Sequence, residues 1–431
     1  MERKLKVFVV GWDEFNYEKL THLPEAGECQ FLPAICFSEM RGKNISIPDL
    51  LDIAEERIKK AGKIDALVTF YDFPGTVLTP IIARKFDLPA PSLQHIMKCE
   101  HKYWSRLEQQ KVIPENIPAF KQFDLYDDNA YDKIGFKPPF WIKPVKSYHS
   151  YLSYKITDRK KFEQSIVKVR KGIDSIIEPF AYIIKNYGID GDVSGLKEKM
   201  FAETVISGHQ CTAEGYAYNG EIRVYGVVDS IRVKGGSSFV RYQYPSSLAA
   251  DVKNKINELS KEVIRQIGLM NSPFNIEYFY NEKSDRIYLL EINPRISQAH
   301  TDLFEKVHGI SNHEVMLNIA LNRQPAKFEH KGEFKVAAHF MHRSFKPGII
   351  REVPSEKEIA ALKKKYPDML IQINIEEGLD LDEMATHHID SYSYILANIF
   401  LGGRNTHELL DKYRYVIDNL TIRIDYHETT G

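Results

Sequence analysis

The sequence carries almost no net charge. Its 58 lysines and arginines balance 59 aspartates and glutamates over 431 residues, which leaves a net charge of -1 at pH 7. Proteins that bind nucleic acid usually show a basic surface, and the basic run Lys363–Lys365 has the composition of a solvated helix face. We therefore expect small molecules as partners and no nucleic acid.

Cysteine is equally scarce. The few cysteines are scattered and form no CxxC pair, so the sequence indicates neither a zinc site nor a disulfide framework. The pair His387 and His388, together with Asp390, has no completing ligand at metal spacing, and we interpret it as part of a loop. The cysteines are Cys29, Cys36, Cys99 and Cys211.

Long apolar runs are missing as well. No stretch approaches the roughly 18 apolar residues of a membrane span, and the apolar run in MERKLKVFVV is too short for a signal peptide. With 43% hydrophobic and 27% charged residues, the composition is that of a globular protein. We expect a cytoplasmic protein that has no membrane partner.

A dinucleotide fingerprint is absent from the N-terminal region. Residues 5–10 form a predicted buried strand, but no GxGxxG follows it, which argues against an NAD enzyme. A helix over 46–62 and a strand over 64–69 complete an alternation that predicts a small, Rossmann-like parallel α/β sheet. In the loop after the second strand, Asp72 either contacts a substrate or acts as a turn or helix-cap residue.

The sequence does contain two adjacent strands that end in polar residues. Residues 274–280 alternate in polarity as a strand does, and residues 287–292 are apolar apart from Glu291. Asn293 shares the parity of Glu291, so the two side chains project from one face of the sheet. This hairpin is the strongest candidate for a functional site.

The register of the hairpin decides where a second acid, Glu277, lies. If Tyr280 pairs with Arg286 across the turn, Glu277 lies opposite Leu289. Glu291 is then the diagonal neighbour of Glu277, at about 7 Å on the same face. Two carboxylates and one amide oxygen are therefore expected to converge.

Such a set of oxygens suits a metal ion bound to a nucleoside triphosphate. Mg²⁺ takes one or two carboxylates and fills its other positions with water and phosphate oxygens. Glu277, Glu291 and Asn293 are therefore the predicted ligands of Mg²⁺ or Mn²⁺. Arg295 adds a planar cation that can hold a phosphate or a developing oxyanion.

A lysine inside an apolar strand points to the same kind of ligand. Lys143 lies in the segment Phe140–Pro144, where burial disfavours an ammonium that meets no anion. We therefore expect Lys143 to face phosphate. A helix predicted over residues 97–110 carries a second lysine, Lys102, which by its position alone is as compatible with a solvated helix face.

These segments together resemble the ATP-grasp superfamily. The run Glu291-Ile292-Asn293-Pro294-Arg295, preceded by Glu277 on an earlier strand, is similar to the family's metal-binding hairpin, and Ile142-Lys143-Pro144 is similar to its phosphate-binding lysine motif. The resemblance implies that Lys143 contacts the α and β phosphates and that Lys102 also reaches the phosphates. Family members more often have Asp-Lys where this chain has His101-Lys102.

The resemblance also assigns a nucleotide-binding hinge. Glu203, Thr204, Val205 and Ile206 correspond to the segment whose backbone reads the adenine edge, and Gln210 corresponds to a ribose-binding residue that is commonly a glutamate. The chain departs from the family after Lys143, where a glycine-rich loop is usual and residues 148–151 contain no glycine. Either side chains supply the phosphate contacts there, namely those of Lys146, Ser147, His149 and Ser150, or ATP turnover is weak.

The resemblance implies an α/β protein, α+β overall, with the ATP-grasp fold. We expect an N-terminal domain over 1–98, an ATP-grasp domain over 99–330 with a lid lobe at about 137–205, and a C-terminal α+β domain over 331–431. In the C-terminal domain the pattern predicts a strand over 334–341 and a final helix over 406–419.

The activity that the resemblance implies is an ADP-forming ligation of a carboxylate to an amine. ATP would convert the carboxylate to an acyl phosphate, and Arg295 would stabilise the oxyanion when the amine attacks. His300, Thr301 and Asp302 are candidates for lining the acceptor site. Two alternatives stay open: a biotin-carboxylase-like enzyme that activates bicarbonate, and an ATP-binding regulatory module without turnover. A homodimer is also open.

Overall fold

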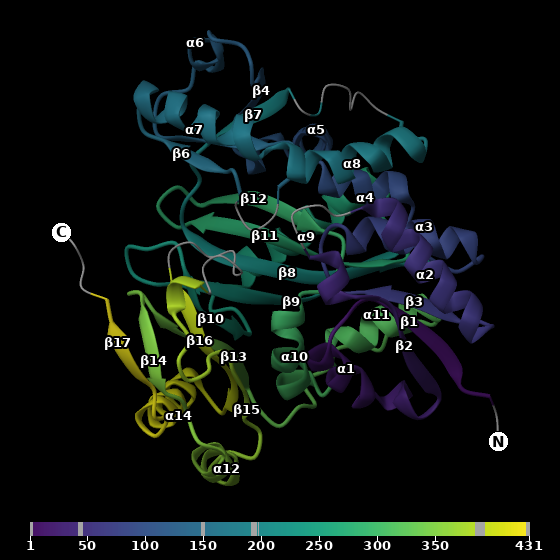
Figure 1. The fold of residues 1–431 in the computed structure, drawn as a ribbon, viewed down its shortest axis with the longest axis vertical. Coiled ribbons are helices and arrows are strands. Elements are labelled where there is room, and N and C mark those ends of the chain that lie inside the picture. Colours follow the sequence, from purple (N-terminus) through teal and green to yellow (C-terminus); the bar gives the residue numbers. More distant parts are fainter. Residues whose placement is uncertain are drawn as a thin grey trace.

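The computed structural model describes residues 3–41, 46–147, 151–190, 196, 198–383 and 393–427. Its strands form four sheets, of three, eight, two and four strands (Figure 1). In Figure 1 the four-stranded sheet lies at the top, the eight-stranded sheet runs through the centre, and the N-terminal sheet lies to the right. The mixed α/β architecture predicted from the sequence is confirmed.

The N-terminal lobe is built on a parallel sheet in the order β2-β1-β3. Its predicted helix is confirmed, because α2 runs over Ile47–Ala61, begins after the Ser46 cap and ends at Gly62, whose φ of +87° favours glycine. The elements are β1 (Leu5–Trp12), α1 (Glu14–Thr21), η1 (Pro24–Gly27), β2 (Cys29–Cys36), η2 (Phe37–Met40), α2, β3 (Ala66–Thr69) and α3 (Gly75–Lys85).

The helix predicted over residues 97–110 is two helices. α4 (Leu93–Glu100) and α5 (Lys102–Val112) meet at His101, whose extended backbone interrupts the helical pattern. The His101 ring accepts a hydrogen bond from the backbone N–H of Trp104 at 3.0 Å and so caps α5. A histidine at this position performs a capping role that aspartate usually performs.

The lid is a four-stranded antiparallel sheet in the order β4-β7-β5-β6. One of its faces packs on helices through a core that includes Phe140, Phe162 and Phe180. It begins before the expected boundary at 137, because β4 is already part of the sheet. The elements are η3 (Pro114–Asn116), β4 (Phe120–Asp124), α6 (Ala130–Ile134), β5 (Phe140–Pro144), β6 (Tyr154–Ile156), α7 (Arg159–Gly172), α8 (Asp174–Asn186) and β7 (Lys199–Thr204).

The central sheet has eight strands in the order β12-β11-β8-β9-β10-β13-β16-β15, and all of its neighbours are antiparallel. α9 packs on it and ends at Gly268. The elements before residue 330 are β8 (His209–Tyr218), β9 (Glu221–Arg232), β10 (Phe239–Tyr244), α9 (Ala250–Ile267), β11 (Ser272–Asn281), β12 (Arg286–Asn293), η4 (Gln298–His300), α10 (Thr301–His308) and α11 (Asn312–Ala320).

The last hundred residues extend this same sheet. β13 (Val336–Ser344) pairs with β10, and β16 (Tyr394–Gly403) and β15 (Leu370–Ile373) continue outward from it. A small separate sheet joins β14 (Gly348–Glu352) to β17 (Arg423–Tyr426), and the helices are α12 (Glu356–Lys365) and α14 (Thr406–Asp418). The division into domains at 98 and 330 stays a prediction.

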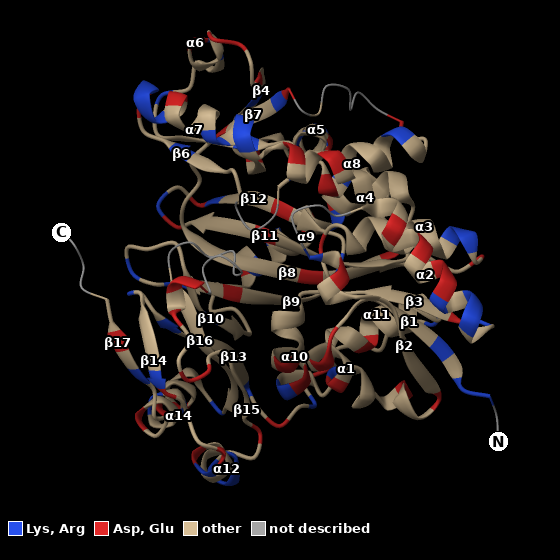
Figure 2. Ribbon diagram, viewed as in Figure 1, with Lys and Arg blue, Asp and Glu red and all other residues tan. Residues whose placement is uncertain are grey.

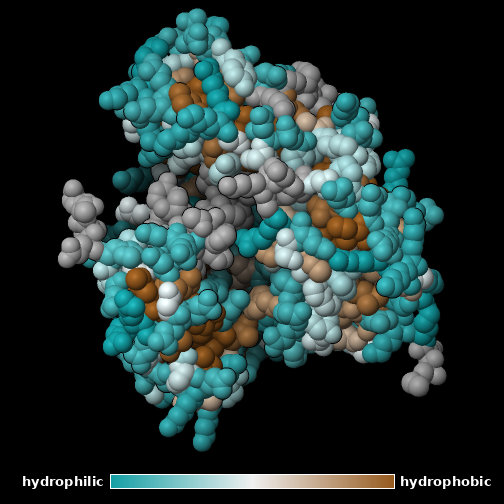
Figure 3. All heavy atoms as spheres, viewed as in Figure 1, coloured by the Kyte–Doolittle hydropathy of each residue, from teal (hydrophilic) through white to brown (hydrophobic). Residues whose placement is uncertain are grey.

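Charges of both signs are spread over the whole molecule (Figure 2), as the balanced composition predicts. The face in Figure 3 is largely hydrophilic, and its hydrophobic side chains gather in small separate areas. Among the described residues, no helix combines the length and the hydrophobicity that crossing a membrane requires.

Candidate active site

The hairpin of β11 and β12 places the two predicted acids directly opposite each other. Glu277 pairs with Glu291 and not with Leu289. The predicted register is wrong by one residue at the turn, where the pairs are Tyr280–Ile287 and Asn281–Arg286, and a β-bulge between Glu277 and Tyr278 shifts the pairing by one more residue. The correction brings the carboxylates closer than the predicted diagonal arrangement would, since directly opposite Cβ atoms lie about 5 Å apart.

The electrostatic environments of these two acids differ. Desolvation and the negative charge of Glu291 raise the pKa of Glu277 above its ordinary value. Desolvation also acts to raise the pKa of Glu291, but the positive charges of Lys102, Lys143 and Lys146 outweigh it and lower that pKa. Lys102 forms an ion pair with Glu291 through Nζ. The hairpin thus holds one acid paired with a lysine and one acid that a further cation would stabilise.

Asn293, the third predicted metal ligand, completes this face of the hairpin. It pairs with Asn275, and its Nδ2 donates to the Asn275 side-chain oxygen at 2.9 Å. Because the amide nitrogen is engaged in this way, the Asn293 Oδ1 is the atom left to accept or to coordinate. The structure therefore brings Glu277, Glu291 and Asn293 together as the sequence predicts; their role as metal ligands stays a prediction.

Lys143 meets an anion, and in the structure that anion is Glu203. Its Nζ lies 2.5 Å from Glu203 Oε2, while Arg106 Nε lies 2.5 Å from Glu203 Oε1. Burial would raise the pKa of Glu203, but the charges of Arg106 and Lys143 lower it to about 2, so the carboxylate stays ionised at neutral pH. Lys102, Lys143, Glu203 and Glu291 line one narrow cleft between the lid sheet and the central sheet.

Arg106 is a component that the sequence did not reveal. Besides Glu203, it donates from Nη2 to the Leu290 carbonyl oxygen at 2.7 Å, and so it joins α5 to both the lid strand β7 and the hairpin strand β12. The residue is buried on a helix face that also buries Ser105, Glu108 and Gln109. From the sequence alone, a helix face with this many polar residues would be interpreted as exposed to solvent. No local pattern identifies Glu203, which is 97 residues away, as the partner of Arg106.

Gln210, the predicted ribose residue, lies on the same sheet face and links two charged groups. Its Nε2 donates to Glu277 Oε2 at 3.1 Å, and its Oε1 accepts from Arg232 Nε at 2.9 Å. One N–H of the amide is left for a further acceptor. Gln210 therefore lies next to the acid pair and fixes the orientation of Glu277.

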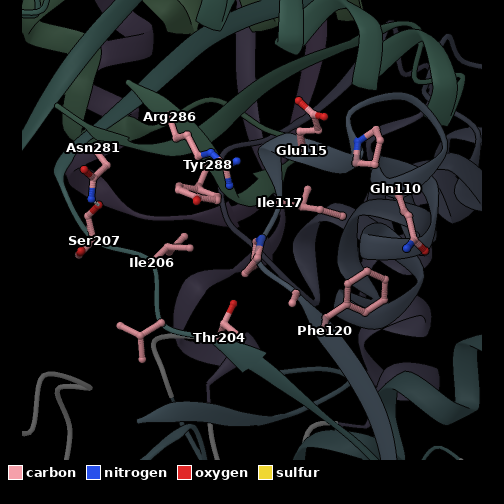
Figure 4. A pocket seen from close by; sticks show the side chains of 14 residues that line it. Gln110, Glu115, Ile117, Phe120, Thr204, Ile206, Ser207, Asn281, Arg286 and Tyr288 are labelled. Carbon is pink, nitrogen blue, oxygen red and sulfur yellow. Dashed lines mark hydrogen bonds between the residues drawn. The ribbon is translucent and has the colours of Figure 1, made fainter. Parts of the chain in front are cut away.

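The hinge residues lie along a larger pocket. Thr204, Val205 and Ile206 line a cavity of about 630 Å³, whose other walls include Phe120 and Tyr288. Figure 4 shows Ile206 and Ser207 on one side of the pocket and Gln110 and Phe120 on the opposite side. Glu203 lines the narrow cleft and Thr204 lines this pocket, so the two cavities meet at adjacent residues of one strand. A volume of this size is typical of small-molecule sites.

Arg295 contacts the N-terminal lobe. Its Nε and Nη2 donate to the two oxygens of Asp72 at 2.5 and 2.7 Å, and its Nη1 donates to the Ile296 carbonyl oxygen at 3.0 Å. Asp72 therefore binds the Nε–Nη2 edge of the guanidinium. One N–H on each of Nη1 and Nη2 remains able to donate to another acceptor. The sequence suggested that Asp72 contacts a substrate or acts as a turn or helix-cap residue. The ion pair gives Asp72 a further role, because it orients Arg295.

Lys146 binds Glu100 at the end of α4, next to residues of the N-terminal lobe. Its Nζ forms an ion pair with Glu100, and both side chains are only 5% exposed. Thr76 Oγ1 donates to the other Glu100 oxygen at 2.5 Å, and the Phe73 ring lies 5.3 Å from Nζ. The lysine therefore anchors the start of the loop that lacks glycine; residues 148–150 of that loop lie outside the described residues, as do His387, His388 and Asp390.

Replacing Lys146 by methionine should destabilise the protein strongly. We expect the free energy of unfolding to fall by about 3–5 kcal/mol, because the Glu100 carboxylate would stay buried without its cation. Chemical denaturation monitored by circular dichroism measures the change. Lys133→Met is the matched control, since Lys133 pairs with Asp127 on the surface and should change stability little. Equal stability of the two variants would contradict the prediction.

Comparison with known proteins gives a family match and related solved structures. Residues 136–302 match the family model described as the ATP-grasp domain. An L-amino acid ligase from Bacillus licheniformis superposes with a TM-score of 0.72 at 16% sequence identity, covering 99% of this chain and 100% of that chain. Phosphoribosylglycinamide synthetase from Anaerococcus prevotii gives 0.64 at 17% identity, covering 98% of this chain and 100% of that chain.

A third structure was solved with ligands bound. The biotin carboxylase domain of Hydrogenobacter thermophilus 2-oxoglutarate carboxylase, in complex with MgADP, ADP and bicarbonate, gives a TM-score of 0.62 at 13% identity. The match covers 98% of this chain and 92% of that chain. At these identities the superpositions establish a common fold.

Proposed function

Because this chain has the ATP-grasp fold and contains an ATP-grasp domain, we propose that it is an ATP-dependent ligase. It would join a carboxylate substrate to an amine through an acyl phosphate and release ADP and phosphate. The amine and the acid would be amino-acid-like, as in the structurally similar L-amino acid ligase. The observation that carries the proposal is the convergence of Glu291, Lys102 and Lys143 from distant segments on one cleft, with Glu277 directly opposite Glu291 on the neighbouring strand.

The residues present fit a divalent cation. Glu277 and Glu291 face each other, the raised pKa of Glu277 marks a site where positive charge is stabilising, and Asn293 offers an amide oxygen beside them. Mg²⁺, or Mn²⁺, would be held by these three residues. When bound, the ion neutralises phosphate charge and orients the triphosphate.

The nucleotide would extend from the acids to the hinge. Lys102 and Lys143, now paired with Glu291 and Glu203, would exchange part of those contacts for phosphate oxygens. Thr204, Val205 and Ile206 would bind the adenine through backbone groups at the pocket of about 630 Å³. Gln210 would use its remaining N–H for the ribose hydroxyls while it keeps Glu277 in place.

The reaction would proceed in two steps. The substrate carboxylate attacks the γ-phosphate in line with the leaving ADP oxygen, while the lysines offset the charge that spreads over the phosphate oxygens. The amine then attacks the acyl carbon, and Arg295, held by Asp72, donates its remaining N–H groups to the tetrahedral oxyanion.

A substrate panel tests this function. Purified protein with ATP and Mg²⁺ should release phosphate with at least one amino-acid pair, and mass spectrometry should detect the amide product. Parallel reactions with bicarbonate and free biotin test the alternative that the biotin carboxylase likeness suggests. Tight ATP binding without ADP formation in every reaction would overturn the proposal and would instead support a regulatory module. A cytoplasmic location and a homodimer stay predictions.

A further inference from the structure

A buried histidine and glutamate lie together beside the candidate active site. His300 Nδ1 lies 2.8 Å from Glu214 Oε1, and the two side chains are 3% and 0% exposed. The Tyr225 hydroxyl donates to the other Glu214 oxygen at 3.4 Å. A carboxylate bonded to one nitrogen of a buried imidazole fixes the ring orientation and stabilises its protonated form. Among the described residues, none forms a hydrogen bond with His300 Nε2.

The pair belongs to the same sheet face as the acids. Glu214 lies on β8 opposite Asn275, whose side chain binds Asn293, and Thr212 on the same strand lies opposite Glu277. Glu214 therefore projects from the face that carries the predicted metal ligands, one step along the strand.

Two further contacts place the pair near the reacting groups. Tyr242 packs edge-on against the His300 ring at 4.9 Å between centroids, and Asn275, which lies opposite Glu214, donates from Nδ2 to the Arg295 carbonyl oxygen at 3.1 Å. Glu214 itself contributes to the electrostatic environment of Arg295. His300 follows Arg295 by five residues, on the short helix η4. The imidazole therefore lies near the segment that carries Arg295, the residue that would stabilise the tetrahedral oxyanion.

We propose that His300 is the catalytic base that accepts a proton from the attacking amine, and that Glu214 is the positioning residue that orients it. The inference rests on the proposed ligase function. It adds a base for the amine, a role that none of the residues proposed to bind the metal, the phosphates or the oxyanion performs. It assigns a specific role to His300, which the sequence suggested only as part of the lining of the acceptor site.

The proton and the electron pairs balance in this step. The nitrogen lone pair of the amine forms the C–N bond to the acyl carbon, and one proton on that nitrogen passes to His300 Nε2. The C–O bond to the phosphoryl group then breaks and inorganic phosphate leaves with the electron pair. Glu214 stabilises the imidazolium until the proton is lost to water. Without a base the strongly basic α-amino nitrogen would keep its extra proton, and the intermediate would return to the acyl phosphate, whereas the weakly basic nitrogen of hydroxylamine loses its proton to water.

Hydroxylamine separates this role from formation of the acyl phosphate. Hydroxylamine is largely neutral near pH 7 and traps acyl phosphates as hydroxamates without the help of an enzymatic base, whereas an α-amino group, with a pKa of about 8, depends on proton removal. We would compare wild type, His300→Gln and Glu214→Gln in two reactions with ATP, Mg²⁺ and the amino-acid panel. One reaction contains hydroxylamine, and the other contains amino acids as the only nucleophiles.

The expected result is a split between the two products. In His300→Gln, amide formation should fall about a hundredfold while hydroxamate formation stays within about twofold of wild type. Glu214→Gln should show the same split with a smaller loss. His308→Gln is the matched control, because His308 is a buried histidine on the adjacent helix whose Nε2 lies 2.6 Å from the Tyr244 hydroxyl; it should leave both products unchanged.

The hydroxamate reaction also shows whether each variant is folded. Equal loss of both products in His300→Gln, or no loss of either, would overturn the role of His300 as a base. If wild type forms neither hydroxamate nor amide, the ligase function itself fails, and the inference fails with it.

Discussion

Glu291→Gln is expected to lower ATP-dependent phosphate release about a thousandfold. The substitution removes one of the two carboxylates that would hold the metal, and it removes the charge that pairs with Lys102. A metal ion contributes several kcal/mol to the stabilisation of the transition state, and each 1.36 kcal/mol corresponds to about a tenfold change in rate. Steady-state phosphate release over a magnesium titration measures the effect.

The same hairpin offers a matched control. Glu282 is an exposed residue of the turn that joins β11 to β12, so Glu282→Gln makes the same chemical change without altering the cleft. It should retain wild-type turnover. Turnover of Glu291→Gln within about tenfold of wild type at saturating magnesium would show that this carboxylate does not hold the ion. Unchanged ATP binding and absent turnover in both the wild type and the variant would instead favour the regulatory alternative.

Arg295→Lys is expected to lower the formation of both hydroxamate and amide by about 100- to 1,000-fold. Arginine holds Asp72 through two nitrogens and keeps further N–H groups for an oxyanion, and a lysine ammonium cannot do both in a fixed plane. Both products pass through a tetrahedral oxyanion, so they should fall together. This joint loss differs from the split expected for His300.

The control for Arg295 is a second arginine in an ion pair. Arg323 pairs with Glu28 at the surface, and Arg323→Lys should leave both reactions unchanged. Product formation is followed by mass spectrometry with the same amino-acid panel. If Arg295→Lys kept normal amide formation, Arg295 would be a structural link to Asp72 and would have no role in stabilising the oxyanion.

The local elements of the fold were predictable because their signals are local. The helix at α2 has a serine cap, an apolar period and a terminal glycine, and it forms within one residue of the predicted limits. The first hairpin strand was found from its alternating polarity, and the second was found from its apolar run. The helix over 97–110 was predicted wrongly because a histidine gives no clear signal for a break, and only the structure shows His101 capping a new helix.

The details of the site depend on contacts between distant segments. Glu291 and Lys102 are 189 residues apart, and Arg295 and Asp72 are 223 residues apart. The position of a β-bulge cannot be deduced from alternation, and it decides that Glu277 faces Glu291. The roles of Lys102 and Gln210 were identified through family resemblance, whereas Arg106 and Glu214 match no motif and became visible only through their buried partners.

The eight-stranded sheet has a mechanical consequence. The acid hairpin β11–β12 and the C-terminal strands β13, β15 and β16 belong to one continuous hydrogen-bonded ladder, so neither can rotate without straining the other. The lid has a sheet of its own, and its chain joins α5 through the segment at 113–119 and the central sheet through the segment at 205–208. An opening that admits a nucleotide therefore costs the least free energy if the lid rotates while the central sheet stays rigid.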